Sequence, residues 1–338
     1  MIAIASVLLV FVLLEAGTRL FIGVETIPEI ERMQLDSVLG WRWTPNYQAE
    51  IEYRGYTYEL KISGQGLRNE TVVMPKPAGQ QRIIALGDSV TAGFGVNLED
   101  TFAKKLQKNL GVEVVNAGVD DYNIEQELLW LERHGLELEP DLVILEVYLN
   151  DSRPFAKSPG WVVTLNNLLL NRSAFYTHYY GWVLQQRARQ SEQAPTFRFR
   201  YQDPWEAGHW KTDEAALTQV IEAGNNDFGL AWQQTENEKI QRTIEKTATL
   251  SHAHNFELFI VIFPVSVQVE TEVEAPWVDQ PQRWLMDFAG TNGIRALDLL
   301  PILRNQANEG LYIDQAHLTP HGHTVVAEAI YTALMTRQ

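Results

Sequence analysis

The sequence contains no cysteine among its 338 residues. Disulfide bonds, zinc sites built on thiolates, a cysteine nucleophile and a lipid-modified cysteine are therefore excluded. Basic residues are also scarce, since 27 Lys and Arg face 43 Asp and Glu, which gives a net charge of −16. Binding to nucleic acid needs a basic face, so this charge balance argues against a nucleic-acid partner. The sequence shows no internal repeat.

Charge is absent from the first 14 residues, in which Ser6 is the one weakly polar member. The apolar stretch is longer than a typical signal-peptide core and shorter than a typical spanning helix. No small-residue cleavage site follows it, and Glu15 and Arg19 are spaced to pair one helical turn apart. We therefore predict an uncleaved transmembrane anchor over residues 1–23. A buried amphipathic helix is the alternative.

Residues 24–79 are predicted to form a stem that precedes the main domain. Two segments with alternating polarity, 47–53 and 56–62, flank a two-residue turn, which is typical of a β-hairpin. Proline and glycine then punctuate the chain up to the predicted main domain, residues 80–338.

The main domain contains apolar runs that alternate with helical patterns. The runs lie at residues 83–86, 112–116, 141–147, 258–263 and 294–297. Runs without alternation are typical of strands buried on both faces, as in a parallel sheet covered by helices. We therefore predict an α/β fold, a three-layer α/β/α sandwich with a five-stranded parallel sheet like that of flavodoxin.

Polar residues mark where the intervening helices begin. Asn97 with Asp100 and Asn123 with Gln126 each have the spacing of a helix cap. Thr319, followed by proline, is predicted to cap the last helix.

Three of the predicted strands end next to residues suited to chemistry. Ser89 follows the first strand, Gly118 the second and Asn150 the third. The carboxyl ends of parallel strands share one edge of the sheet, which is where ligands bind in open α/β folds. A serine at that edge is a nucleophile when a base and oxyanion donors converge on it.

The chain resembles the SGNH, or GDSL-type, hydrolase family, whose four blocks supply Ser, Gly, Asn and His in this order. The matching blocks are Gly87-Asp88-Ser89-Val90, Asn116-Ala117-Gly118, Asn150-Asp151 and Asp314-Gln315-Ala316-His317. The resemblance covers residues 80–152 and 236–338. Gly66-Leu67-Arg68 and the apolar N-terminus resemble the membrane-anchored bacterial branch of that family, with a weaker match over residues 1–79.

The resemblance implies a catalytic triad of Ser89, His317 and Asp314 that needs no cofactor and no metal. His317 serves as the base, because imidazole accepts and returns a proton near neutral pH. Asp314 holds the imidazole in the productive tautomer. The backbone N–H groups of Ser89 and Gly118 and the side-chain amide of Asn150 form the oxyanion hole. The family has the flavodoxin-like fold predicted above.

The function implied is that of a serine acyl-ester hydrolase acting through an acyl-enzyme on a small-molecule, lipid or glycan ester. With the anchor, it implies a periplasmic or other extracytoplasmic catalytic domain. An O-acyltransferase with the same triad, acting for example on an envelope glycan, is one alternative. A non-catalytic, membrane-anchored binding or scaffold subunit is another.

The individual residues also have simpler interpretations. Gly118 is compatible with an ordinary turn, and Asn150 with the end of a strand or a helix cap. His321 and His323, taken with Asp314, offer a metal site, although their spacing is loose and a glycine separates the two histidines. The family pattern places glycine where this chain has Tyr148, which predicts either a narrower cleft or an added stacking surface.

Residues 152–235 interrupt the alternation of strands and helices and are rich in aromatic side chains. These are Trp161, Phe175, Tyr176, Tyr179, Tyr180, Trp182, Phe197, Phe199, Tyr201, Trp205 and Trp210. A long aromatic insertion is typical of a functional segment, and we predict a cap over the cleft. A packing annex and a surface for a membrane or a protein partner are the alternatives.

Overall fold

The computed structural model describes residues 2–23, 31–155, 157–193, 207–224 and 227–336. The chain divides into two compact units. The first consists of Met1–Thr44 and Ala156–Arg198, and the second of Pro45–Phe155 and Phe199–Gln338. Four aromatic residues of the predicted cap, Phe197, Phe199, Tyr201 and Trp205, lie outside the described residues.

The first unit combines helices with a short hairpin. Its elements are α1 (Ile2–Phe21), β1 (Met33–Asp36), β2 (Gly40–Trp43), α6 (Gly160–Arg172) and α7 (Ala174–Gln193). The predicted pair in α1 is confirmed, because Arg19 Nε lies 2.6 Å from Glu15 Oε1. Glu15 also accepts the Ser173 hydroxyl at 2.7 Å. The charged side chains of α1, Glu15 and Arg19, thus form hydrogen bonds to the turn between α6 and α7.

Within the ranges given above, no helix has both the length and the apolar character needed to cross a membrane. The transmembrane anchor predicted over residues 1–23 is therefore not supported.

The second unit begins with the predicted hairpin, β3 (Gln48–Tyr53) and β4 (Tyr56–Lys61). The strands pair in antiparallel fashion with Tyr53 opposite Tyr56. Arg54 and Gly55 form the turn with φ of 48° and 82°. Positive φ at both turn residues is what the type I′ form of a two-residue hairpin loop requires.

The main sheet of the second unit contains five parallel strands, as predicted. Their order is β6 (Glu113–Asn116), β5 (Arg82–Leu86), β7 (Leu142–Tyr148), β8 (Glu257–Phe263) and β9 (Arg295–Asp298). Numbered by position in the chain, this is the order 2-1-3-4-5 of flavodoxin-like sheets, in which ligands bind where the strand order reverses. β5 and β7 flank that point.

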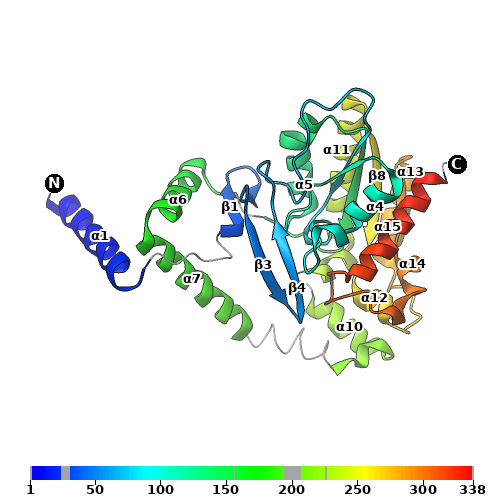
Figure 1. The fold of residues 1–338 in the computed structure, drawn as a ribbon. Coiled ribbons are helices and arrows are strands. Elements are labelled where there is room, and N and C mark those ends of the chain that lie inside the picture. The colour runs from blue at the N-terminus through cyan, green and yellow to red at the C-terminus, as the bar shows by residue number, and fades with distance from the viewer. Residues whose placement is uncertain (1, 24–30, 156, 194–206, 225–226, 337–338) are drawn as a thin grey trace. The chain divides into compact units, whose positions relative to one another are not determined.

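Helices cover both faces of this sheet (Figure 1). Helices α5 (Ile124–Trp130), α11 (Gln234–His254) and α13 (Gln280–Thr291) pack side by side, and α4 (Phe102–Leu110) packs beside α15 (Pro320–Met335). The described residues of this unit also form α3 (Ser89–Ala92), α10 (Glu214–Ala223), α12 (Ser266–Glu270) and α14 (Leu300–Arg304), together with short helical segments. β5 and β7 are buried along their whole length. The predicted three-layer arrangement fits this fold.

Two of the three predicted helix caps are confirmed. Asn123 and Gln126 form a reciprocal capping box at the start of α5, and Thr319 caps α15. The cap at Asn97 is wrong, because Thr101 caps α4 instead. Asn97 Oδ1 accepts the backbone N–H of Glu59 at 2.9 Å, so a contact with the hairpin replaces the local cap.

The aromatic side chains of the insertion differ in burial. Trp210, in the second unit, is 1% exposed and belongs to the hydrophobic core. Trp161 and Trp182, in the first unit, are 72% and 57% exposed. The part near Trp210 therefore packs as core, whereas the cap over the cleft stays a prediction.

Candidate active site

Ser89 is the first residue of α3, which begins directly after β5 and a two-residue turn. Asp88 caps this helix by accepting the N–H of Val90 at 2.7 Å. A side chain on Gly87 would overlap the Glu146 carboxylate, so glycine is needed there. A buried strand and a tight, glycine-dependent turn thus fix the position of the Ser89 hydroxyl.

The structure brings Ser89, His317 and Asp314 into direct contact. Ser89 Oγ lies 2.9 Å from His317 Nε2, and His317 Nδ1 lies 2.8 Å from Asp314 Oδ2. An ionised carboxylate only accepts hydrogen bonds, so its contact favours the tautomer with the proton on Nδ1. Nε2 is then able to accept the proton of the Ser89 hydroxyl.

Asp314 is buried, with a side chain only 1% exposed. Its Oδ1 accepts the backbone N–H groups of Ala316 and His317, each at 2.8 Å. Burial by itself raises the pKa of Asp314, but the hydrogen bonds and charge of His317 outweigh burial and hold the pKa well below its usual range. Burial also lowers the pKa of His317, but Asp314 prevails and raises it above the usual value.

Two aromatic residues that the motifs do not contain surround the imidazole. The ring of Phe94 packs on His317 with centroids 4.6 Å apart. Tyr53, at the end of β3, donates its hydroxyl to Asp314 Oδ2 at 2.8 Å. The ring of Tyr53 meets that of Phe94 edge-on at 4.9 Å. The hairpin therefore contributes directly to this site.

Arg68 holds the loop that carries Phe94. Its buried guanidinium donates to the carbonyl oxygens of Ala92, Gly93 and Val96. Burial lowers its pKa to about 10, so the side chain stays charged at neutral pH. The Gly66-Leu67-Arg68 segment singled out in the sequence thus supports the loop next to the imidazole.

Gly118 approaches α3 so closely that a Cβ would overlap the backbone of Ala92. Its N–H donates to Asn116 Oδ1 at 3.1 Å, and Asn116 Nδ2 donates to the carbonyl of Thr91 at 2.8 Å. The close approach explains the glycine. As an oxyanion donor, Gly118 would have to share its N–H with Asn116.

Asn150, which follows β7, is 8% exposed, and its Oδ1 is buried without a hydrogen-bond partner among the described residues. Burial raises the pKa of Asp227, whereas the charge of Arg153 and the nearby Asn150 amide lower it. An amide carries two N–H donors. The Asn150 side chain is therefore chemically suited to donate to an oxyanion. No sequence pattern marks Asp227.

A cluster of buried carboxyl groups lies close to the start of α3: Asp88, Glu127, Glu146 and Asp151. Glu146 Oε2 accepts the N–H of Thr91 at 2.9 Å and also the Thr91 hydroxyl. Burial, reinforced by mutual repulsion, raises the pKa of Glu127, Glu146 and Asp151 well above the ordinary range, and burial raises that of Asp88 to about 6. Glu146 of this cluster thus supports the turn that carries the serine through its hydrogen bonds to Thr91.

The histidines of the alternative metal site are engaged elsewhere. His321 is exposed and lies 2.8 Å from Glu309 Oε2. His323 is fully buried, accepts the N–H of Phe102 at 3.2 Å, and has a pKa lowered to about 3, mainly by burial. In the described part of the chain, no group of three or more His, Asp or Glu side chains is arranged to hold a metal ion.

Tyr148 does not provide the stacking surface that its place in the motif suggested. It is 2% exposed and belongs to the hydrophobic core. Its N–H donates to Asp151 Oδ2 at 2.8 Å, and its hydroxyl lies 3.5 Å from the carbonyl oxygen of Gln315. Tyr148 thus packs inside the domain, behind the loop that carries Asp314.

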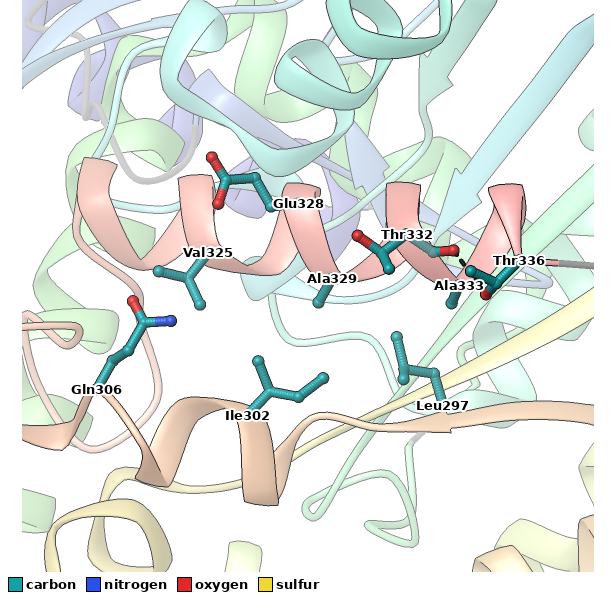
Figure 2. Close-up of a pocket in the computed structure, with 9 residues that line it drawn as sticks. All are labelled: Leu297, Ile302, Gln306, Val325, Glu328, Ala329, Thr332, Ala333 and Thr336. Carbon is teal, nitrogen blue, oxygen red and sulfur yellow. Dashed lines mark hydrogen bonds between the residues drawn. The ribbon is translucent and has the colours of Figure 1, made fainter.

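A pocket of about 360 Å³ lies between α15 and the segment formed by β9 and α14 (Figure 2). Its lining residues are Leu297, Ile302, Gln306, Val325, Glu328, Ala329, Thr332, Ala333 and Thr336. None of these belongs to the group around Ser89, so this pocket is separate from the candidate active site.

Comparison with known proteins gives a family match to part of the chain. Residues 85–197 match the GDSL-like Lipase/Acylhydrolase family. The match contains Ser89, Gly118 and Asn150 and ends before Asp314 and His317. It supports an ester-hydrolysing enzyme. No curated protein matches the chain.

Solved structures of low sequence identity are also similar to this chain. A member of the lipolytic G-D-S-L family from Veillonella parvula has 11% identity and a TM-score of 0.45, over 76% of this chain and 100% of that one. An acetylxylan esterase from Geobacillus stearothermophilus has 13% identity and a TM-score of 0.44, over 77% and 96%. The acetyl xylan esterase AlAXEase has 16% identity and a TM-score of 0.44, over 75% and 99%. At these scores, the likenesses carry no argument about substrate.

Proposed function

We propose that this protein is a serine acyl-ester hydrolase in which Ser89 is the nucleophile, His317 the base and Asp314 the residue that orients the base. The observation that carries the proposal is the continuous contact from Ser89 Oγ through the imidazole to Asp314, with distances of 2.9 and 2.8 Å. The family match over residues 85–197 supports the same reaction class.

The contacts lead to a two-step mechanism. Ser89 Oγ attacks the ester carbonyl while His317 Nε2 takes the hydroxyl proton, and the oxyanion is stabilised by the N–H groups of Ser89 and Gly118 and the amide of Asn150. The ester C–O bond then breaks, and His317 returns its proton to the leaving oxygen. Water attacks the acyl carbon with His317 again as base, the bond between that carbon and Ser89 Oγ breaks to release the acid, and His317 returns the proton to Ser89 Oγ. Every proton is thus accounted for.

The substrate class proposed is an O-acyl ester of a small molecule, a lipid or a glycan. The test is labelling of the purified full chain with a fluorophosphonate probe, with the site identified by peptide mass spectrometry. We expect the label on Ser89. Labelling of another residue, or labelling that persists in Ser89→Ala, would overturn the nucleophile assignment.

The activity is expected to fall as the pH drops, because protonated His317 cannot accept the Ser89 proton. The pKa of His317 is raised by Asp314, so the acid limb of the kcat/KM profile should have its midpoint above the ordinary histidine value of about 6.5. The measurement is hydrolysis of an aryl acetate across pH 5 to 9 (roughly the histidine titration range). A flat acid limb would contradict the role of His317 as base.

We also propose that the catalytic domain acts outside the cytoplasm and that the protein is attached to a membrane through its first unit. The support for the membrane attachment is the exposed apolar surface of that unit, where Leu13, Phe21 and Trp161 are 62%, 88% and 72% exposed. Cell fractionation followed by a high-salt wash tests this attachment. Recovery of the full chain in the fraction without membranes would argue against it.

A further inference from the structure

We propose that Tyr53 is a positioning residue that sets the proton affinity of His317 by sharing the carboxylate of Asp314. This inference rests on the proposed function, because it assigns a role within the same catalytic group. Tyr53 lies in the hairpin and outside all four sequence blocks. Its hydroxyl donates to Asp314 Oδ2 at 2.8 Å, the oxygen that also contacts His317 Nδ1 at 2.8 Å.

The contact completes the hydrogen bonding of a buried carboxylate. The other donors to Asp314 are two backbone N–H groups and the imidazole, all from residues 316 and 317. Tyr53 is 261 residues away in the chain. Its hydroxyl is therefore the donor through which the hairpin acts on the orientation and charge of this carboxylate.

Tyr53 is suited to act as a donor across the working pH range. Burial, followed by the charge of Asp314, raises the pKa of its phenol to about 12. The hydroxyl thus stays protonated and cannot become a competing base. The ring is held edge-on against Phe94, whose ring packs on His317, so the hydroxyl has little freedom to leave Asp314.

The pKa of His317 depends on several charged groups around its imidazole. Asp314, Asp88 at the start of α3, and Asp120 after β6 all raise the pKa of His317. The cation of Arg54 lies 5.9 Å from the Tyr53 ring centroid. A donor to Asp314 disperses its negative charge and weakens its pull on the imidazolium. Loss of this one donor, with the other charges in place, should therefore raise the proton affinity of His317.

The test is Tyr53→Phe, with Tyr56→Phe as the matched control. Tyr56 is the cross-strand neighbour of Tyr53 in the same hairpin and is exposed. We expect Tyr53→Phe to move the acid limb of kcat/KM upward by about 0.5 to 1 pH unit and to lower kcat about 3- to 10-fold, with KM nearly unchanged. The control should match the wild type in all three quantities.

A second readout does not depend on activity. The imidazole of His317, identified by the signal missing from His317→Gln, is titrated by NMR in the wild type and both tyrosine variants. We expect the same upward shift in Tyr53→Phe. A lower melting temperature with an unchanged titration midpoint would overturn the inference, since it would indicate a purely structural role. If the midpoint shifts but the wild type neither hydrolyses esters nor takes the probe, the inference stands and the proposed function fails.

Discussion

Replacement of Asp314 with asparagine is expected to lower kcat for an aryl acetate by about 10⁴-fold, the usual cost of forcing the catalytic histidine into the wrong tautomer. Two backbone N–H groups, of Ala316 and His317, bind Asp314 Oδ1. They should retain the amide oxygen at that position and turn the amide NH₂ toward His317 Nδ1. The imidazole must then carry its proton on Nε2, where it can no longer accept the proton of Ser89.

Asp287→Asn is the matched control, because it is the same substitution at an exposed position on α13, away from the site. It should retain wild-type kcat. Thermal melting of both variants separates misfolding from a tautomer effect. An Asp314→Asn enzyme that folds and keeps more than about a tenth of wild-type kcat would show that Asp314 does not control the tautomer, because an intact base needs the Nδ1 proton.

Replacement of Asn150 with alanine is expected to lower kcat about 10²- to 10³-fold, the range seen when one oxyanion donor is removed. The reason is that the amide is needed only when charge develops on the ester oxygen, so KM should change little. Steady-state kinetics on an aryl acetate give both constants.

Asn292→Ala provides the control for this variant. Asn292 is exposed at the end of α13, and its side chain donates to the carbonyl oxygen of Phe288 at 2.8 Å. It should leave kcat unchanged. An unchanged kcat in Asn150→Ala would remove this side chain from the oxyanion site, whereas an equal fall in both variants would point to a general loss of folded protein.

The strands and most helices of the second unit follow from local patterns. β5 and β7 lie where mainly apolar runs predict them, because a strand covered on both faces needs apolar residues at most of its positions. α15 begins at Pro320 after the Thr319 cap, as predicted. The predicted cap at Asn97 is wrong because a tertiary contact replaces the local one. The Asn97 side chain accepts a hydrogen bond from Glu59 in the hairpin and none from its own helix.

The sequence contains a signal for Glu146, but it does not show what this residue does. It interrupts the apolar strand β7, where a carboxyl group costs free energy unless it is hydrogen-bonded. In the fold, it accepts the N–H of Thr91 and supports the turn at Ser89. A lone acid within a fully buried strand is therefore a sign of a buried partner, but the sequence does not name that partner.

The sequence by itself determined the sheet, the order of its strands along the chain, and the residues that follow the strand ends at its edge. It did so because apolar runs, caps and the four blocks are each encoded within a few neighbouring positions. The tertiary structure alone decided that Tyr53 reaches Asp314, that Asp227 lies near Asn150 and that the N–H of Gly118 donates to Asn116. The contacts of Tyr53 and Asp227 join segments far apart in the chain, and the direction of a single N–H depends on how a loop packs, so no local spacing of residues contains them.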